Sequence, residues 1–283
     1  MLNEELQTAM NLARSAGALI MEFYRTGVAI EEKIGADDYI EPVTIADRTA
    51  SELIVEGLEK AFPGDGILSE EAADTKERLF KERVWMIDPM DGTLGFINRS
   101  DDFAVQIGLA QNGKPVLGVV YQPVEDILYF ASAGNGAFRM EPKGEILRLS
   151  VSEKTDFSKI NLAVSYNHRS PKMRLVKERL GIKKETRRGS VGIKVGLVAT
   201  RRCDLYIHLS NRTKYWDTCA PQIILEEAGG RFTDIFGGEY RYDLSDVQNH
   251  NGLVASNGVC HDAVLKGLRP LLTKFGRLRV ASR

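Results

Sequence analysis

Most of the chemical information in this chain lies in one segment, Trp85-Met86-Ile87-Asp88-Pro89-Met90-Asp91-Gly92-Thr93. Its apolar beginning predicts a buried strand that delivers Asp88 at its end, because Pro89 lacks the N–H that the next ladder hydrogen bond needs. With a tight turn between them, the carboxylates of Asp88 and Asp91 can converge on one point. Gly92 and Thr93 then offer backbone N–H groups and a hydroxyl at an expected helix start, where anions bind.

Carboxylates beside a phosphate seat repel an anionic ligand unless divalent cations lie between them. The segment therefore predicts a phosphate site bridged by Mg²⁺. The alternative is purely structural, since an Asp that caps a turn at the end of a strand gives a similar local pattern.

Further acidic residues can complete such a site, namely Asp47, Glu70, Glu71 and Asp217. Adjacent side chains point to different sides, so one of Glu70 and Glu71 can bind a metal while the other faces elsewhere. Each residue also has an ordinary interpretation, because surface acidic pairs are common and Asp217 stands where an N-cap would precede an apolar helix. Their occurrence together and in this order favours the metal site.

The composition is that of an ordinary globular protein, with 283 residues of which 43% are hydrophobic and 27% charged. This length suggests two domains or one large α/β unit. A formal net charge of −1 argues against a protein that binds nucleic acid by neutralising many phosphates. No apolar run approaches the roughly 18 residues of a membrane span, and the acidic start does not resemble a secretory signal. The three cysteines are widely spaced and fit no disulfide framework or zinc site, which favours a reducing cytoplasm.

The order of the expected elements favours a mixed α/β fold. Helices are expected over residues 2–25 and 44–61, and a short strand at 67–68 precedes the strand at 84–88. Alternating apolar runs then predict an antiparallel meander with strands at 103–110, 116–122, 127–132 and 146–151, and a turn at 133–137. Beyond it, helices at 173–180, 195–200 and 216–228 alternate with strands at 162–165 and 204–209. We expect a soft boundary near residue 150, between an N-terminal half (1–150) and a C-terminal half (151–283).

The acidic motifs, taken together, resemble the lithium-sensitive, Mg²⁺-dependent phosphatases of the inositol monophosphatase superfamily. The matching segments are Pro42-Val43-Thr44 with Asp47, Glu70-Glu71, Asp88-Pro89-Met90-Asp91-Gly92-Thr93, Trp216-Asp217 with Glu227-Ala228-Gly229-Gly230, and Leu253-Val254-Ala255-Ser256-Asn257-Gly258. They span most of the chain, and the Asp-Pro-x-Asp-Gly-Thr segment is the most specific of them. The resemblance implies a layered α/β/α/β/α sandwich of the sugar-phosphatase type.

The resemblance also implies roles for particular residues. The expected metal ligands are Glu70, Asp88, Asp91, Asp217 and the carbonyl oxygen of Met90. Gly92 and Thr93 would contact the phosphate. Thr93, Asp47 and Glu70 are the expected catalytic residues, with Thr93 and Asp47 helping to position or deprotonate the attacking water.

Secondary features point to a substrate. Leu94-Gly95-Phe96 stands where the monophosphatases usually have Asn-Phe, and it resembles the 3′(2′),5′-bisphosphate nucleotidases, which remove the 3′-phosphate of 3′-phosphoadenosine 5′-phosphate. The segments 164–170 and 189–194 are also similar to those enzymes, which implies substrate contacts by His168, Ser190 and Lys194. Cations away from the metals, including Arg169, would then hold the second phosphate. As an alternative, His168 is an ordinary loop residue and Lys194 is a solvated helix residue.

Other activities with the same chemistry remain open, namely those of inositol-1-monophosphatase, fructose-1,6-bisphosphatase and histidinol-phosphatase. A non-catalytic phosphate-binding protein is the alternative from another class. The expected partner is a small phosphorylated metabolite, with no nucleic acid polymer and no membrane, and the resemblance allows a homodimer because the family includes dimers and monomers.

Overall fold

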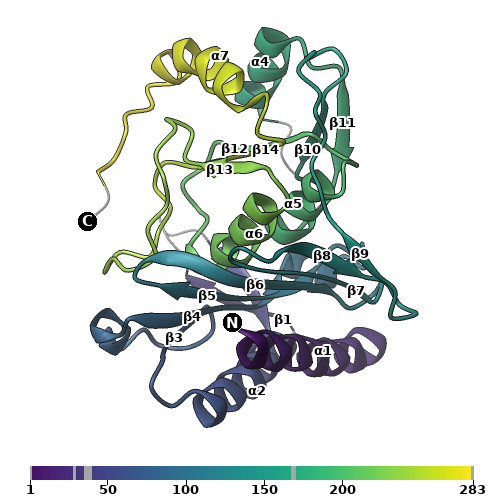
Figure 1. Cartoon of the computed structure of the whole chain (residues 1–283), viewed down its shortest axis with the longest axis vertical. Helices are drawn as coiled ribbons and strands as arrows, with labels where there is room; N and C mark the ends of the chain where they lie inside the picture. Colours follow the sequence, from purple (N-terminus) through teal and green to yellow (C-terminus); the bar gives the residue numbers. More distant parts are fainter. Residues whose placement is uncertain (1, 28–29, 35–39, 167–169, 282–283) are drawn as a thin grey trace.

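The computed structural model describes residues 2–27, 30–34, 40–166 and 170–281. Helices and sheets alternate in layers along the longest axis of the molecule (Figure 1). From the bottom of that view, the layers are a helix pair, a large sheet, a second helix pair, a smaller sheet and a third helix pair. This arrangement confirms the expected mixed α/β fold and its α/β/α/β/α order.

The first two layers are built from the N-terminal half. Their helices are α1 (Asn3–Thr26) and α2 (Ile45–Ala61), which pack on one face of the large sheet. The strands of that sheet are β3 (Gly66–Ser69), β4 (Arg83–Asp91), β5 (Ala104–Gln111), β6 (Lys114–Gln122), β7 (Ile127–Ser132), β8 (Gly136–Met140) and β9 (Ile146–Arg148). A hairpin of β1 (Ile30–Ile34) and β2 (Ile40–Thr44), a 3₁₀ turn η2 (Glu77–Phe80) and the short helix α3 (Thr93–Ile97) complete this half.

The seven-stranded sheet has the order β3-β4-β5-β6-β7-β8-β9. Only its β3–β4 pair is parallel, and from β4 to β9 each strand pairs antiparallel with the next, which confirms the predicted meander. One strand was not predicted: β8 begins inside the expected turn at 133–137, because the turn is shorter than its Gly and Asn residues suggest. The last strand, β9, ends at Arg148 rather than at residue 151.

The remaining layers come from the C-terminal half. Their helices are α4 (Pro171–Leu180), α5 (Val191–Ala199), α6 (Tyr215–Glu227) and α7 (His261–Lys274). The five-stranded sheet has the order β11-β10-β12-β14-β13, formed by β10 (Asn161–Val164), β11 (Lys184–Arg187), β12 (Leu205–His208), β13 (Arg231–Thr233) and β14 (Leu253–Ser256). The sequence predicted α4, α6, β10 and β12, whereas β11, β13 and α7 were not predicted.

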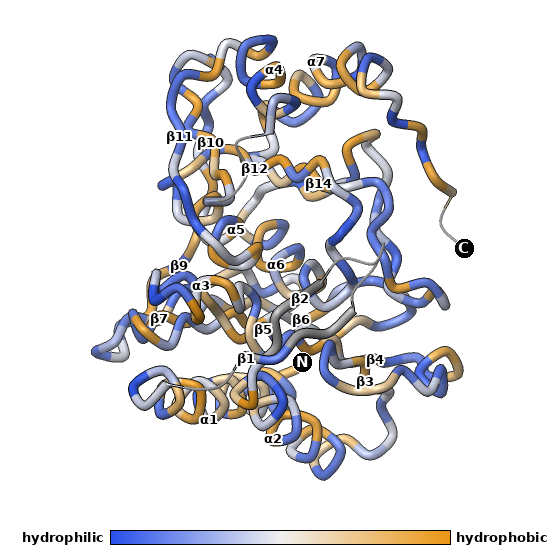
Figure 2. Tube along the Cα trace, turned by 180° about the vertical axis from the view of Figure 1, so that it is seen from behind, coloured by the Kyte–Doolittle hydropathy of each residue, from blue (hydrophilic) through white to orange (hydrophobic). Residues whose placement is uncertain are grey.

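Helices α5 and α6 fill the space between the two sheets, and their hydropathy fits that position (Figure 2). All nine residues of α5 are buried, because the helix has an apolar partner on every side. Ser190 caps α5, so the helix begins four residues earlier than the expected 195. Among the described residues, four apolar clusters fill the spaces between the layers: one below the large sheet, two between the sheets, and one under α4 and α7.

Two glycines let α6 approach the large sheet closely. A Cβ at Gly108 would lie 2.8 Å from the backbone nitrogen of Ala220, and a Cβ at Gly118 would lie 2.4 Å from the carbonyl oxygen of Ala220. Cys219 is buried in this contact as a small apolar residue. The contact fixes the height of α6 above β5 and β6.

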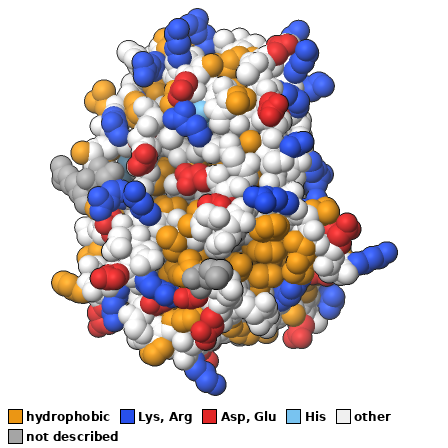
Figure 3. Space-filling view, viewed as in Figure 1, with side chains coloured by type: hydrophobic (Ala, Val, Ile, Leu, Met, Phe, Trp, Pro, Cys, Tyr) orange, Lys and Arg blue, Asp and Glu red, His pale blue; other side chains and the backbone are white. Residues whose placement is uncertain are grey.

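The surface carries charges of both signs. On the face shown in Figure 3, Lys and Arg side chains are interspersed with Asp and Glu side chains, as expected for a net charge near zero. Among the described residues, no helix combines the length and the apolar character that a membrane crossing requires.

The contact at Gly118 generates a stability prediction. Gly118→Ala forces a methyl group against backbone that cannot move by rotating a side chain, so we expect a loss of about 1–3 kcal/mol in the free energy of unfolding. Gly64→Ala is the matched control, because a Cβ at Gly64 has no heavy atom within 4 Å. Denaturant unfolding of both variants measures the difference, and equal stability would contradict the close contact.

A buried histidine generates a pH prediction. His261 is fully buried, with Nε2 at 2.9 Å from Thr233 Oγ1 and Nδ1 at 2.8 Å from Ser256 Oγ, and burial lowers its pKa from 6.5 to about 4. Between these values the unfolded chain binds a proton that the folded protein excludes, so the free energy of unfolding decreases as the pH falls from 6.5 to 4. Relative to His261→Gln, we expect the wild type to lose about 3 kcal/mol between pH 7 and pH 4. If the free energy of unfolding falls equally with pH in the wild type and in His261→Gln, then His261 does not cause the loss of stability.

Candidate metal and phosphate site

The end of β4 places its two aspartates on one side of the chain. Asp88 pairs with Gln106 and Asp91 with Ala104, so β4 has one residue more than β5 over this interval. Residues three apart in a regular strand point to opposite faces, and the extra residue of this β-bulge brings them to the same face. The expectation that the strand ends at Asp88 is therefore wrong: β4 continues to Asp91, and Pro89 lies within the bulge, where a missing N–H is tolerated.

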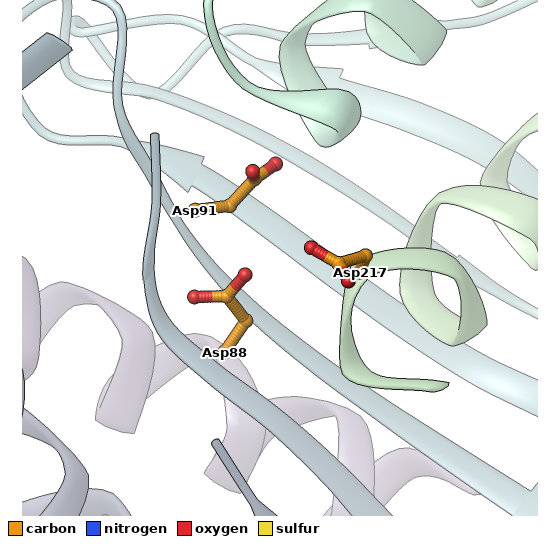
Figure 4. Close-up of side chains that lie close together, drawn as sticks. All are labelled: Asp88, Asp91 and Asp217. Atoms are coloured by element: carbon orange, nitrogen blue, oxygen red, sulfur yellow. The ribbon is translucent and has the colours of Figure 1, made fainter. Parts of the chain in front are cut away.

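Asp217 joins these two residues from the other half of the chain. One carboxylate oxygen each from Asp88, Asp91 and Asp217 can be chosen so that all three atoms lie within 4.8 Å of one another (Figure 4). Asp217 lies in the first turn of α6, where it accepts a hydrogen bond of 2.5 Å from the backbone N–H of Lys214. It is therefore the third residue of the helix rather than the N-cap of the ordinary interpretation.

The electrostatics of this cluster fit a bound cation. Burial raises the pKa of Asp88 well above its usual range, and the charges of Glu70, Asp91 and Asp217 raise it further. Burial and the same kind of repulsion, from Asp91 and Glu70, raise the pKa of Asp217. Among the described residues, Asp88 Oδ2 is buried without a hydrogen-bond partner. A divalent cation that prefers oxygen ligands would satisfy this atom and cancel the repulsion, so the residues present fit a metal such as Mg²⁺.

Glu70 lies beside the cluster. Its backbone N–H donates to the carbonyl oxygen of Ile87 at 3.0 Å, which extends the parallel pairing of β3 and β4 and brings Glu70 next to Asp88 in space. Its charge raises the pKa of Asp47, Asp88, Asp91 and Asp217. Glu70 is not one of the three residues whose oxygens lie within 4.8 Å, so its role as a metal ligand stays a prediction.

Asp47 and Thr93, the residues that the resemblance gives a role in positioning the attacking water, are in contact. Thr93 Oγ1 lies 3.2 Å from Asp47 Oδ1 and 3.3 Å from the carbonyl oxygen of Met90. The other oxygen of Asp47 accepts hydrogen bonds from the backbone N–H and the hydroxyl of Thr44, at 2.7 and 2.6 Å, in the capping box that starts α2. Burial raises the pKa of Asp47, while the hydrogen bonds from Thr44 oppose this shift.

Gly92 has a conformation that requires glycine. Its φ is +98°, and a Cβ would lie 2.5 Å from the carbonyl oxygen of Asp102. The chain then enters α3 at Thr93, which confirms the expected helix start. Gly92 therefore turns the backbone directly after Asp91, next to the acidic cluster, and its predicted phosphate contact stays a prediction.

Ser190 and Lys194 support the cluster in this structure. The Ser190 hydroxyl donates to Asp91 Oδ2 at 2.5 Å, and the backbone N–H of Gly192 donates to the same oxygen at 3.0 Å. These bonds and the charge of Lys194 oppose the rise that burial causes in the pKa of Asp91. The N-terminus of α5 therefore holds one oxygen of Asp91.

The Lys194 side chain is enclosed, not solvated. Only 2% of it is exposed; its ammonium donates to Ser165 Oγ at 3.0 Å and to the carbonyl oxygen of Gly189, and lies 4.9 Å from the centre of the Tyr206 ring. Burial lowers the pKa of Lys194 to about 8. The interpretation of Lys194 as a solvated helix residue is therefore wrong. Substrate contacts by Lys194 and Ser190 stay predictions, and the burial of both side chains does not favour them. His168 and Arg169 lie outside the described residues.

Sequence reasoning did not find several supporting residues. Thr44 was part of the matching motif, but its bond to Asp47 was not anticipated; a Thr followed three residues later by an acidic residue is the signal that could have shown it. Asn249 was not identified: its side chain donates to the carbonyl oxygen of Lys214 at 2.8 Å and to Thr218 Oγ1 at 3.2 Å, which holds the first turn of α6. No local pattern marks a loop residue of this kind.

Known proteins are similar to this chain in sequence and in fold. The family model described as "Inositol monophosphatase family" matches residues 1–272. The chain is 32% identical over 278 residues to "Fructose-1,6-bisphosphatase/inositol-1-monophosphatase" of Thermotoga maritima, covering 96% of this chain and 99% of that protein. It is 36% identical over 230 residues to "3'(2'),5'-bisphosphate nucleotidase CysQ" of Salmonella typhimurium, covering 81% and 90%. The solved structure of a Thermotoga maritima IMPase superposes with a TM-score of 0.80 at 28% identity, covering 96% of this chain and 100% of that one.

Alternating layers of helices and sheets around a cluster of carboxylates that could hold a metal ion are typical of a class of phosphatases. The chain belongs to the inositol monophosphatase family. This confirms the resemblance that the motifs suggested. The relatives bear the names of enzymes that act on different phosphate esters, so the substrate has to be argued from the site.

The repulsion within the cluster predicts a metal-dependent stability. Asp88→Asn removes one charge but keeps an oxygen that can accept the 3.0 Å bond from the Met90 N–H. In EDTA we expect this variant to unfold several degrees above the wild type, because about 1–2 kcal/mol of repulsion is relieved. In millimolar Mg²⁺ the wild type should gain stability and the variant should gain much less, as measured by thermal unfolding.

Asp126→Asn is the matched control. Asp126 accepts a bond from the Tyr121 hydroxyl and is absent from the acidic cluster, and its φ of +50° suits asparagine. The metal site is contradicted if Asp88→Asn and Asp126→Asn respond alike to Mg²⁺.

Proposed function

We propose that this protein is a Mg²⁺-dependent phosphatase that hydrolyses a phosphate monoester of a small metabolite. The cluster of Asp88, Asp91 and Asp217 is the observation that carries the proposal, because three carboxylates in mutual repulsion fit a cation site rather than a structural turn. Membership of the inositol monophosphatase family supports the reaction class.

The metal contributes the electrophilic part of the chemistry. When bound, Mg²⁺ neutralises charge on the phosphate and lowers the pKa of water, so that a nucleophile is available at neutral pH. In this proposal Glu70, Asp88, Asp91, Asp217 and the Met90 carbonyl oxygen hold the metal. Ser190 and Gly192 fix one oxygen of Asp91, and this limits the reorientation of that carboxylate during the reaction.

Thr93 and Asp47 handle the proton of the attacking water. The Thr93 hydroxyl can donate its one hydrogen bond to Asp47 Oδ1 or to the Met90 carbonyl oxygen, and its own oxygen can accept a hydrogen bond from water. The raised pKa of Asp47 suits a group that takes up a proton through Thr93. Gly92 and Thr93, at the beginning of α3, are the proposed phosphate contacts.

We propose the 3′-phosphate of 3′-phosphoadenosine 5′-phosphate as the group that is removed. The CysQ relatives support this substrate, and so does Gly95. A Cβ at residue 95 would lie 2.4 Å from the carbonyl oxygen of Asp102, so the asparagine usual in monophosphatases does not fit this backbone. The second candidate is inositol 1-phosphate or fructose 1,6-bisphosphate, which the name of the Thermotoga maritima relative supports.

Further properties follow from the same proposal. Inhibition by Li⁺ rests on the family resemblance alone. A cytoplasmic location is supported by the cysteines, which are all buried and free. Division into halves 1–150 and 151–283 and assembly as a homodimer stay predictions.

A substrate panel tests the proposal. Phosphate release from 3′-phosphoadenosine 5′-phosphate, inositol 1-phosphate, fructose 1,6-bisphosphate and histidinol phosphate is measured with Mg²⁺ and with EDTA, and we expect the nucleotide to give the highest kcat/KM. Asp91→Asn should lose on the order of a thousandfold in kcat, because it weakens the charge that holds the metal. Asp126→Asn is the control, with unchanged rates. Wild-type kcat in Asp91→Asn would refute the metal mechanism, and no turnover of any ester would revive the non-catalytic binding protein.

A further inference from the structure

The loop at residues 246–251 lies against the first turn of α6, which carries Asp217. Figure 4 shows the Asp217 carboxylate at the beginning of this helix, directed toward Asp88 and Asp91. A hydrogen bond of 2.5 Å from the Lys214 N–H holds one oxygen of this carboxylate. The orientation of Asp217 therefore depends on how the backbone around Lys214 is held.

The peptide group between Thr213 and Lys214 connects the loop to Asp217. Its carbonyl oxygen accepts a hydrogen bond of 2.8 Å from the backbone N–H of Asn249. Its N–H is the donor of the bond to Asp217. Because a peptide group is planar, the bond at its carbonyl oxygen also sets the direction in which its N–H points. The position of Asn249 therefore affects one carboxylate oxygen of Asp217.

The next peptide group, between Lys214 and Tyr215, is also bonded to the loop at both ends. Its carbonyl oxygen accepts a bond of 2.8 Å from the side-chain amide of Asn249, and its N–H donates to the carbonyl oxygen of Val247 at 3.0 Å. The same amide donates to Thr218 Oγ1 at 3.2 Å. Asn249 is only 5% exposed, and burial makes these bonds stronger than the same bonds in water. The Asn249 side chain therefore holds the whole first turn of α6.

Residues 277–280, the C-terminal strap, hold the loop in turn. Arg277 Nη2 donates to the carbonyl oxygen of His250 at 3.0 Å. Val280 and Asn251 form a reciprocal pair, in which the Val280 N–H donates to Asn251 Oδ1 and Asn251 Nδ2 donates to the Val280 carbonyl oxygen, both at 2.9 Å. The last two residues of the loop are therefore bonded to the strap.

The strap has a further anchor in the C-terminal half. Arg279 Nε lies 3.8 Å from Asp234 Oδ2, and this oxygen also accepts a bond of 3.2 Å from the Asn251 side chain. The strap lies beyond residues 1–272, which the family model matches. Its contact with the loop is therefore a feature that membership of the family does not by itself imply.

We propose that Asn249 is a positioning residue for the metal ligand Asp217, and that the C-terminal strap keeps Asn249 in place. The inference rests on the proposed metal-dependent phosphatase function, in which Asp217 binds the metal. Without the Asn249 amide, the carbonyl oxygen of Lys214 loses this donor and the first turn of α6 is held less firmly. Binding of the metal must then also order Asp217, and this lowers the affinity for the metal.

Binding of Mg²⁺ in the absence of substrate tests this inference. Isothermal titration calorimetry on the full chain gives the Kd for Mg²⁺, and thermal unfolding in EDTA gives the stability of the same proteins. In Asn249→Ala we expect the Kd to rise about tenfold, as for other residues that orient metal ligands. Val280→Pro removes the N–H that bonds to Asn251 and should raise the Kd about threefold, because one hydrogen bond of the strap is lost.

Asn257→Ala is the matched control for Asn249→Ala. Asn257 is 1% exposed, and its amide also donates to a carbonyl oxygen and to a hydroxyl, those of Lys154 at 2.9 Å and Ser152 at 3.0 Å. Neither partner belongs to α6 or to the acidic cluster. This control should lose stability in EDTA but keep the wild-type Kd for Mg²⁺. Val280→Ala keeps the backbone N–H, so it should also keep the wild-type Kd.

The outcomes separate this inference from the proposed function. Equal Kd values in the wild type and Asn249→Ala, or an equal rise in Asn257→Ala, would mean that Asn249 only stabilises the fold. If Asn249→Ala does not fold, Val280→Pro decides, since Val280 is 45% exposed, and an unchanged Kd in that variant overturns the inference. A wild type that binds no Mg²⁺ refutes both. A wild type that binds Mg²⁺ and needs it for hydrolysis supports the proposed function whatever the variants show.

Discussion

The repulsion between Asp88, Asp91 and Asp217 is the constraint around which the molecule is organised. Three carboxylates so close together, two of them buried, destabilise the folded chain unless positive charge reaches them. The protein supplies part of that charge itself. The N-terminal turn of α5 donates to Asp91, that of α6 contains Asp217, and that of α2 holds the neighbouring Asp47. Lys194 adds a full charge from within the core. The remaining imbalance of charge is the feature that fits a bound cation.

The geometry behind this repulsion depends on two backbone features. The β-bulge in β4 turns Asp88 and Asp91 to the same side, and the glycines at 108 and 118 let α6 approach closely enough for Asp217 to join them. Both features cost stability locally, since a bulge gives up ladder bonds and a glycine packs no side chain. Function and packing are therefore coupled in the same few residues.

The sequence was most informative where chemistry and local pattern coincide. Alternation of apolar residues predicted the meander, and the Asp-Gly-Thr motif predicted the turn into α3. It was least informative where tertiary contacts decide. The strand β11 consists of polar and mostly exposed residues, and β13 has only three residues, so only their neighbours make them strands. The bulge was misinterpreted as the end of the strand, because a proline gives the same signal in both cases. Lys194 has no periodic signature, so its enclosed position required the structure.

The origin of the cluster in two halves of the chain has a consequence for how the molecule holds together. Asp88 and Asp91 belong to the large sheet, whereas Asp217 belongs to a helix that arrives after the smaller sheet has begun. An ion shared by these three carboxylates would connect the two halves across the interior, and its binding free energy would be linked to the docking of one half on the other. Neither half contains all three aspartates of the cluster. Fragments produced by a cut between the halves would have to reassociate before the cluster could form again.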